Sequence, residues 1–203
     1  MFMAESEAGH GLLRIETPRD YFPWFVIGVV TVAVVIFLNV QGRGWWCPAG
    51  DYWPWSFDIW SQHNSQHVID PYSFTHILHG IVEFWLLGLI FWKLPMAWRL
   101  VLAIVVESTW EAVENTNYVI NRYREATISL DYFGDSIINS IADIVCCGFG
   151  FVIAYKLRFL WSLALFVATE AVLLLWIRDS LVVNVIMLIY PLDAIKQWQT
   201  AGM

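Results

Sequence analysis

Residues 25–38 read FVIGVVTVAVVIFL, and they lie within a stretch from Tyr21 to Gly42 that contains no charged residue. An α-helix rises 1.5 Å per residue, so this stretch reaches about 33 Å, enough to cross the roughly 30 Å hydrocarbon core of a bilayer. The segment after it lacks the small-residue cleavage pattern of a secretory signal peptide. The stretch therefore predicts a membrane-spanning helix that is retained in the mature protein.

The composition of the whole chain agrees with a membrane protein. Of its 203 residues, 59% are hydrophobic and only 14% are charged, and the mean hydropathy is +0.58. Soluble domains carry about 45–50% apolar and about 25% charged residues. The net charge of −7 also speaks against the basic patch that binds nucleic acid. We therefore expect no nucleic acid among the partners, and we exclude a soluble or disordered chain.

Several further apolar stretches follow the first one. The last of them has 13 residues and reaches only about 20 Å as a helix, so we expect a short sixth span that tilts, re-enters or lies shallow. The expected fold is all-α: a polytopic transmembrane bundle of about six spans, in a single domain over 21–200 after a cytoplasmic tail over 1–20. The expected spans are 21–42, 73–92, 97–118, 135–155, 159–177 and 180–192.

The distribution of basic residues predicts the orientation of these spans, because cytoplasmic loops carry an excess of Lys and Arg. A cytoplasmic N-terminus places seven basic residues inside and four outside. It also places the two long polar connections, 41–72 and 119–134, together on the periplasmic face. The inside set is Arg14, Arg19, Lys93, Arg99, Lys156, Arg158 and Lys196, and the outside set is Arg43, Arg122, Arg124 and Arg178.

Three consecutive spans each carry a stripe of polar side chains. Ionisable groups inside a membrane are costly, so each is a candidate functional residue. Spacings of three, four and seven residues place the members of a stripe on one helix face. The expected topology places all three stripes in the outer half of the bilayer, where they converge. The stripes are His76, His79 and Glu83; Glu107, Glu111 and Glu114; and Asp135, Asn139 and Asp143.

The six carboxylates of these stripes require compensation by protons, basic partners or metal cations, because burial and like charges both disfavour ionisation. Imidazole together with carboxylate is a common ligand set for zinc, iron or manganese, so the histidines favour a metal. A carboxylate outside the coordination sphere then acts as a general base. We expect Glu107, Glu111 and Asp135 in the catalytic role, and His76, His79, Glu83, Glu114 and Asp143 as metal ligands.

A second candidate metal site lies upstream, in the first long connection. His63, His67 and Asp70 follow one another at i, i+4 and i+7, which places them on one face if the stretch before Pro71 is helical. The loop set and the membrane set are alternatives. Neither matches an established ligand motif such as His-Glu-x-x-His.

Other side chains of the same region are candidates for substrate binding. Arg122 and Arg124 lie in the second long connection, and a guanidinium group matches the geometry of an anionic phosphate headgroup. Trp110 and Asn139 complete the expected substrate-binding set. The alternative reading of polar groups such as Asn139 is structural, because hydrogen bonds between side chains hold transmembrane helices together.

The cysteines and tryptophans have structural interpretations. Cys47, Cys146 and Cys147 form no Cys-x-x-Cys pair, and we interpret them as small packing residues. Residues 44–60 read GWWCPAGDYWPWSFDIW, and such rings favour the membrane interface. The alternative is that this segment forms a platform for a lipid headgroup or sugar.

Four short runs of residues together resemble a known family, a group of alphaproteobacterial inner-membrane proteins of unknown function. The resemblance covers about residues 20–200 and implies a multi-pass protein of the bacterial inner (cytoplasmic) membrane, without implying a reaction. The acidic helices are also loosely similar to those of VanZ-like membrane proteins. The runs are His76-x-x-His79-Gly80, Glu107-x-x-Trp110-Glu111-x-x-Glu114-Asn115, Arg122-Tyr123-Arg124-x-x-Thr127 and Gly134-Asp135-Ser136-x-x-Asn139.

Three classes of function agree with these features. The first is a membrane-embedded, metal-dependent hydrolase or transferase that opens to the periplasm and acts on a membrane lipid or a lipid-linked envelope precursor. The second is a non-catalytic subunit of a larger membrane complex, including one whose histidines bind haem or a chlorin. The third is an ion, proton or small-solute carrier with Glu83, Glu107 and Asp143 as its relay.

Overall fold

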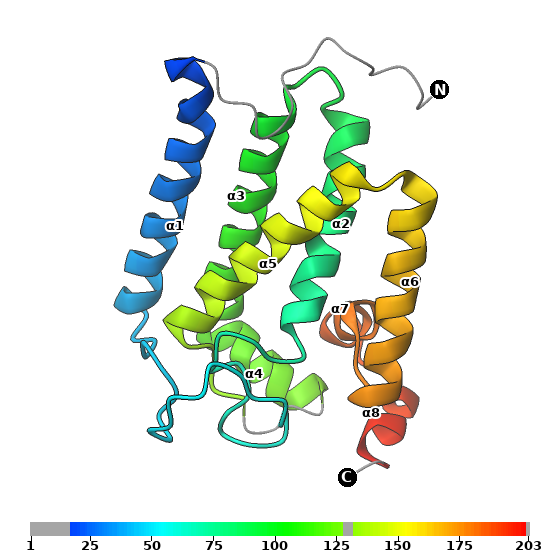
Figure 1. Ribbon diagram of the computed structural model, residues 1–203. Helices are drawn as coiled ribbons and strands as arrows, with labels where there is room; N and C mark the ends of the chain where they lie inside the picture. Colours follow the sequence, from blue (N-terminus) through cyan, green and yellow to red (C-terminus); the bar gives the residue numbers. More distant parts are fainter. Residues whose placement is uncertain (1–16, 128–131, 202–203) are drawn as a thin grey trace.

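The computed structural model describes residues 17–127 and 132–201, and all regular elements within these ranges are helical. The expected tail therefore lies almost entirely outside the described residues. Figure 1 shows the arrangement of the helices. They are the 3-10 helix η1 (Pro18–Tyr21), α1 (Phe22–Val40), α2 (Ser73–Ile90), α3 (Met96–Glu114), α4 (Asn117–Ala126), α5 (Ile137–Lys156), α6 (Phe159–Trp176), α7 (Leu181–Ile189) and α8 (Asp193–Thr200).

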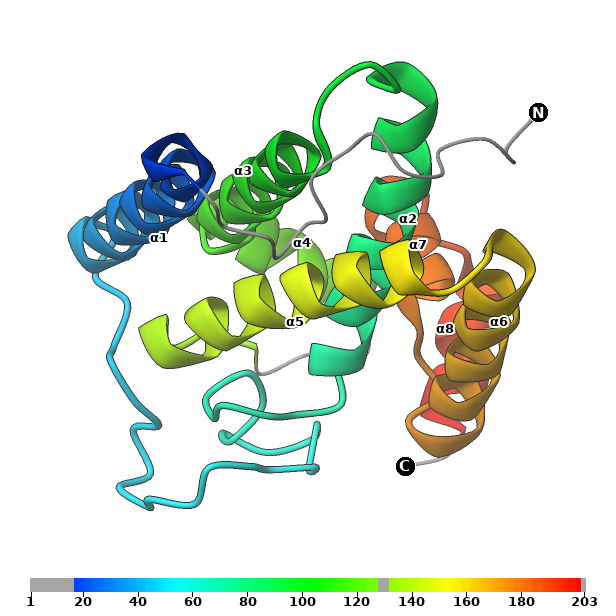
Figure 2. The ribbon, with the colours of Figure 1, turned by 45° about the horizontal axis from the view of Figure 1, so that its top comes forward.

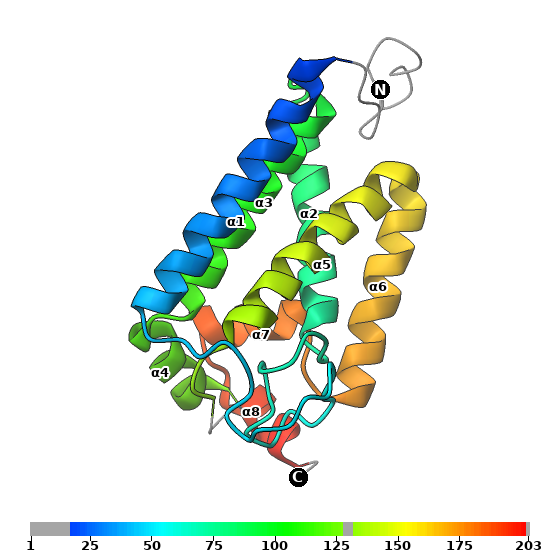
Figure 3. The same cartoon turned by 60° about the vertical axis from the view of Figure 1, so that its left-hand side comes forward.

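Four of the helical segments are long and apolar enough to cross a membrane: Pro18–Val40, α2, α5 and α6. Helix α3 is equally long, with 19 residues, but it carries Arg99 and the three glutamates of its polar stripe. These five long helices run side by side, with α5 inclined across the others (Figures 1 and 3). The regular elements of the described residues are thus all helical, and four of them have the length and composition of membrane spans.

The long helices differ in how much of their surface is covered by protein. In the most apolar 18-residue stretch of each helix, only 17% of the residues are buried in α1 and in α6, against 50% in α5. In Figure 2, where the top of the molecule is tilted toward the reader, α5 lies across α2 in the middle, with α1 and α3 on one side and α6 on the other. The exposed apolar faces of α1 and α6 are suited to contact lipid, and the polar stripes lie on the inner helices.

Glycines allow α2 and α5 to pack closely enough to bring their polar faces together. A Cβ atom added at Gly80 of α2 would lie 1.9 Å from the carbonyl oxygen of Cys147, and one at Gly150 of α5 would lie 2.0 Å from that of Ile77. The two backbones therefore touch at both positions, as small residues allow in membrane helices. This crossing fixes the register that places His76 of α2 opposite the polar face of α5.

Both long connections lie at the same end of the bundle, together with α4, α7 and α8 (Figures 1 and 3). The short turns α2–α3 and α5–α6 lie at the opposite end. Arg99 closes the α2–α3 turn, donating from Nε to Leu94 O at 2.8 Å and from Nη2 to Trp92 O at 2.6 Å. The shared end of the two long connections agrees with the sequence, and the side of the membrane that it faces stays a prediction.

The expected sixth span is not confirmed. Helix α7 has nine residues, so it rises only about 14 Å and is too short to cross. The following α8 stays beside α4, because Lys196 Nζ donates to Glu125 O at 2.5 Å. Lys196 therefore lies at the end of the long connections and not with the N-terminus of α1. The ratio of basic residues becomes six against five, which no longer decides the orientation.

The expected third span also ends earlier than its apolar pattern suggests. Helix α3 stops at Glu114, and Thr116 begins α4 by accepting a hydrogen bond from Val119 N at 3.4 Å. A side-chain oxygen at this position satisfies a free backbone N–H of the new helix. Much of the second long connection is therefore the short helix α4, which covers the end of the bundle.

Candidate functional site

The two histidines of α2 converge on one carboxylate of α3. His76 Nδ1 is bonded to Glu107 Oε1, and His79 Nδ1 lies 2.9 Å from Glu107 Oε2. The rings of His76 and His79 meet edge to face, with their centroids 4.9 Å apart. The helical spacing that places both rings on one face thus directs them to a single shared acceptor. We call His76, His79 and Glu107 the central triad.

Two more carboxylates face the triad without hydrogen bonds of their own. Glu111 Oε1 lies 3.6 Å from His76 Nδ1, and Asp143 Oδ2 lies 3.8 Å from His76 Nε2. Both oxygens of Glu111 and Oδ1 of Asp143 are buried and have no hydrogen-bond partner. Glu111 is 0% exposed and Asp143 3% exposed. Unpartnered buried carboxylate oxygens are costly, which makes them natural positions for a cation or a proton.

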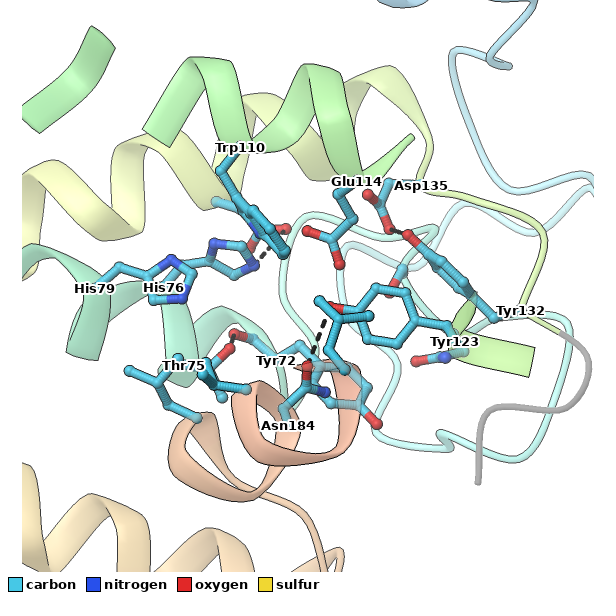
Figure 4. Close-up of a pocket in the computed structure, with 16 residues that line it drawn as sticks. Tyr72, Thr75, His76, His79, Trp110, Glu114, Tyr123, Tyr132, Asp135 and Asn184 are labelled. Atoms are coloured by element: carbon cyan, nitrogen blue, oxygen red, sulfur yellow. Dashed lines mark hydrogen bonds and ion pairs between the residues drawn. The ribbon is translucent and has the colours of Figure 1, made fainter. Parts of the chain in front are cut away.

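A cavity of about 60 Å³ adjoins the triad. Figure 4 shows its lining, with the histidines of α2 on one side, Glu114 and Trp110 of α3 above, and α7 below. The lining combines polar and apolar side chains from the five helices α2, α3, α4, α5 and α7, from the first long connection and from the segment before α5. Its residues are Asn64, Ser65, Tyr72, Thr75, His76, His79, Trp110, Glu114, Tyr123, Tyr132, Asp135, Asp143, Leu181, Asn184, Val185 and Leu188.

Asp135 anchors the part of the cavity opposite the histidines. Its Oδ2 accepts from Asn115 Nδ2 at 2.7 Å and its Oδ1 from the Tyr132 hydroxyl at 2.8 Å. Burial raises the pKa of Asp135, and the hydrogen bonds from Tyr132 and Asn115 oppose this rise. Burial and the nearby carboxylates raise the pKa of Tyr123 and of Tyr132 well above the usual range. Both phenols therefore stay protonated, and Tyr123 donates to Asn184 Oδ1 at 3.0 Å.

The two expected substrate-binding arginines do not line this cavity. Arg122 Nε donates to Leu188 O at 2.9 Å, and Arg124 Nε donates to Tyr132 O at 2.5 Å. Each guanidinium thus holds a backbone segment at the end of the bundle. Among the described basic side chains, His76 and His79 are the ones that contact the central acids, and the arginines instead position α7 and the segment before α5.

Glu83 and Asn139, the remaining members of the stripes, lie outside the cavity. Glu83 Oε2 accepts from the thiol of Cys147 at 3.2 Å, so this cysteine has a polar partner in addition to its packing. Asn139 Nδ2 donates to His67 O at 2.9 Å and to Asp70 Oδ2 at 3.3 Å. Its contacts are those of a positioning residue that ties α5 to the first long connection.

The two loop histidines, His63 and His67, contact each other. Their further partners differ from Asp70, which the sequence predicts. Residues 61–67 form turns and no helix. His63 Nδ1 lies 3.2 Å from His67 Nε2, and Cys47 and Asp51 complete this group. Asp70 instead accepts from the backbone nitrogens of Tyr72 and Ser73 at the start of α2. The structure thus groups His63 and His67 of the expected loop set with Cys47 and Asp51, and Asp70 lies outside this group.

Among residues 17–127 and 132–201, four groups of side chains have ligand atoms close enough to share a metal ion, within 4.8 Å of one another. Three of them belong to the polar centre, and the fourth is the loop group. The pattern of the sequence pointed to most of the central members and missed Cys47 and Asp51. It also did not indicate α7, because that stretch was expected to run through the membrane. The central groups are His76, His79 and Glu107; His76, Glu111 and Glu114; and Glu83, Glu107 and Cys147.

Comparison with known proteins places the chain in a family. The family model described as "Protein of unknown function (DUF2585)" matches residues 38–201, which is most of the chain. The chain belongs to the DUF2585 family. A UPF0314 protein of Paracoccus denitrificans is 41% identical to it over 188 residues, covering 93% of this chain and 97% of the relative.

Two further relatives agree with this assignment. The DUF2585 chain is 42% identical to a UPF0314 protein of Brucella anthropi, over 87% of this chain and 92% of the relative. It is 44% identical to one of Rhizobium meliloti, over 85% and 87%. No solved structure matches the chain. The family is uncharacterised, so the function must be argued from the site itself.

Proposed function

We propose that this DUF2585 protein is a metal-dependent enzyme of the bacterial inner membrane that acts on a lipid or a lipid-linked substrate. The observation that carries the proposal is the central triad beside the cavity, with the unpartnered oxygens of Glu111 and Asp143 facing it. Ionisable groups buried in a membrane protein mark functional sites, because their cost must be offset by a role.

The triad offers a place for a zinc, iron or manganese ion. His76, His79 and Glu107 present one ligand atom each within 4.8 Å of one another. An ion bound to them would replace the protons that the two rings share with Glu107. Bonds of about 2.0–2.2 Å to nitrogen and oxygen require a nitrogen–oxygen separation of about 3.3 Å, so the His79 ring, whose Nδ1 lies 2.9 Å from Glu107 Oε2, would move outward by about 0.4 Å and the closer His76 ring by more.

The neighbouring groups suit the activation of water. A metal ion held by the triad would lower the pKa of a bound water, and Glu111, whose Oε1 lies 3.6 Å from His76 Nδ1 and has no hydrogen-bond partner among the described residues, would be the general base. The hydroxyls of Tyr123 and Tyr132 face the same space, and each donates its single proton to a protein group, to Asn184 and to Asp135. Their oxygens are suited to accept a hydrogen bond from a hydroxyl or amine of a substrate, which differs from the binding of an anionic headgroup that the sequence assigned to Arg122 and Arg124.

The size and lining of the cavity favour a lipid-type substrate over a bulky cofactor. Its 60 Å³ is far below the roughly 300 Å³ at which ordinary small-molecule pockets begin, so an ion, waters and a small reacting group fit better than a haem or chlorin. Leu181, Val185 and Leu188 of α7 form an apolar wall. The apolar bulk of the substrate would remain in the bilayer and present only its headgroup to the triad.

The proposed location follows from the architecture. Proteins that span the bacterial outer membrane are β-barrels, whereas the described part of this chain is helical. The named relatives come from bacteria such as Brucella and Rhizobium. A helical bundle in such a cell belongs in the inner membrane, and we propose that the end with α4 and α7 faces the periplasm.

The test is turnover by the purified protein in vesicles of bacterial phospholipid, with and without a polyprenyl diphosphate, loaded in turn with Zn²⁺, Fe²⁺ or Mn²⁺. We expect release of a water-soluble headgroup or phosphate, reduced about 100-fold or more in Glu111→Gln because a general base is removed. Glu170→Gln is the matched control, since Glu170 is a buried glutamate of α6 outside the centre. The proposal fails if no metal supports turnover and His79→Ala binds as much metal as the wild type.

A further inference from the structure

The loop group lies apart from the central triad, in the connection between α1 and α2. Cys47 Sγ lies 3.3 Å from His63 Nδ1, and His63 Nδ1 lies 3.2 Å from His67 Nε2. Asp51 closes the group, with Oδ2 at 3.5 Å from His63 Nδ1 and Oδ1 at 3.6 Å from His67 Nε2. Four side chains of the three residue types that bind zinc thus point at one another.

We propose that Cys47, Asp51, His63 and His67 hold a structural zinc ion that fixes the connection between α1 and α2 over the end of α5. Four protein ligands close the coordination sphere of zinc, which is the arrangement of structural sites. A catalytic zinc site keeps an open position for water. The loop group is therefore suited to a different task from the central triad.

The distances between the ligand atoms are those of a tetrahedral zinc site. Zinc bonds of about 2.3 Å to sulfur and about 2.0–2.1 Å to nitrogen or oxygen give separations of about 3.6 Å for sulfur–nitrogen pairs and about 3.3 Å for the others. The observed separations run from 3.2 to 3.6 Å. These four separations thus differ from the expected ones by about 0.3 Å or less, whereas the rings of the central triad must move further apart.

The surroundings of His67 prepare it as a ligand. Its Nδ1 lies 2.6 Å from Trp53 O, and because a carbonyl oxygen only accepts, Nδ1 carries the proton. In the neutral ring, Nε2 is then left with a free lone pair directed at His63, Asp51 and Cys47. A backbone carbonyl that fixes the ring tautomer in this way is the usual second partner of a zinc-binding histidine.

The other ligands are also positioned, and the charges balance. Trp46 Nε1 donates to Asp51 O at 2.6 Å, and the Trp46 ring meets the His67 ring edge to face at 5.7 Å. His67 is 0% exposed and Cys47 5% exposed, so two of the four ligands are buried. A thiolate and a carboxylate together neutralise Zn²⁺, and the two neutral imidazoles add no charge.

An ion at this position would order the lining of the central cavity. Asn64 and Ser65 lie between the two loop histidines and line the cavity. Ser65 has φ 56°, a left-handed conformation that turns the chain between His63 and His67. Ser136 N donates to Ser65 O at 3.0 Å, which joins this turn to the start of α5. The zinc would hold the turn closed and thereby keep one wall of the cavity in place.

The test uses the full chain purified in detergent, with Co²⁺ as a spectroscopic probe in place of Zn²⁺. We expect a sulfur-to-cobalt charge-transfer band in the wild type that is lost in Cys47→Ser. Cys146→Ser and Cys147→Ser are matched controls and should keep the band, since neither residue belongs to the loop group. A band that depends on Cys147, or no band while Co²⁺ is bound, overturns the proposal.

Zinc content provides a second measurement that does not depend on the folding of a variant. The X-ray absorption spectrum at the zinc edge of the wild-type protein should show a sulfur neighbour, one per zinc bound at the loop site, and a spectrum with nitrogen and oxygen neighbours alone contradicts the loop site. His79→Ala should lower the metal content at the triad and leave the sulfur-bound zinc unchanged. The loop site and the proposed function thus fail independently of each other.

Discussion

The side-chain amide of Asn139 donates a 2.9 Å hydrogen bond to the backbone carbonyl of His67, which joins the first turn of α5 to the loop group. Asn139 is 1% exposed, and its amide also reaches Asp70 Oδ2 at 3.3 Å. One member of the polar stripe of α5 therefore stabilises the first long connection by hydrogen bonds. This contact makes the position of the loop dependent on a helix that faces the central triad.

Replacement of Asn139 by Ala should loosen the loop. The change leaves two buried acceptors without their donor, at a cost of about 1–3 kcal/mol in the free energy of unfolding. Hydrogen exchange measured by mass spectrometry should become faster in peptides covering 61–70. Asn39→Ala is the matched control, because Asn39 is exposed on α1. Unchanged exchange in 61–70 would show that the amide does not hold the loop.

The crossing of α2 and α5 should not tolerate a methyl group. In Gly80→Ala the new Cβ meets Cys147 O at 1.9 Å, and a backbone atom cannot move aside as the end of a side chain can. We expect a loss of about 3 kcal/mol or more in thermal unfolding experiments, at the upper end for overpacking. Gly28→Ala in α1 is the control, since nothing lies within 4 Å of its added Cβ. Equal melting temperatures for the two variants would contradict this packing.

The convergence of the central residues was predictable from the sequence, and the loop group was not. Helical spacing places His76 and His79 on one face whatever the details of the helix, so the approach to Glu107 follows once the spans are assigned. The loop group depends on a turn with Ser65 in a left-handed conformation. No periodic pattern encodes such a turn. Cys47 lies 16 residues before His63, and no motif in the sequence links the two residues.

The role of α7 and of the arginines was missed for a related reason. An apolar run of 13 residues does not show where its helix ends, and α7 occupies only nine of them. Helix α7 therefore lies beneath the cavity and contributes Asn184 to its lining. The following helix α8 lies at the same end of the bundle. Arg122 and Arg124 bond to backbone carbonyls, and the sequence carries no information on which carbonyls a fold leaves free.

Coupling between His79 and Glu107 should be measurable as a non-additive effect on stability. His79→Ala and Glu107→Gln each break the same contact, so the double variant should lose less than the sum of the single losses. We expect an interaction energy of about 0.5–3 kcal/mol from a double-mutant cycle in detergent. His63→Ala with Glu107→Gln is the control pair and should be additive, because these residues share no contact. Additivity in the first pair would rule out the shared acceptor.

The pH dependence of stability should carry the signature of Asp179, which lies between α6 and α7. Burial raises the pKa of Asp179 to about 6, and the charge of Glu170 contributes to this rise. An unfolded Asp titrates near about 3.9, so between these values the folded state holds a proton that the unfolded state has released. The folded state is therefore stabilised by this group as the pH falls from 7 to 4, and it loses that contribution as the pH rises through 6.

Asp179→Asn removes this titration and keeps an amide oxygen that can accept from Ser180 N, which lies 2.9 Å from Asp179 Oδ1. Tyr72 OH and Asn184 Nδ2 both donate to Asp179 Oδ2, which the substitution replaces with an amide NH2 group. The loss of this acceptor lowers the free energy of unfolding by an amount that does not vary with pH. The stability of the variant relative to the wild type should therefore be most favourable near pH 7.5 and should decline toward pH 4.5. Thermal unfolding in detergent at both pH values measures this difference. A difference that is constant, or that grows toward low pH, would mean that the carboxyl is not destabilised by burial in the folded protein.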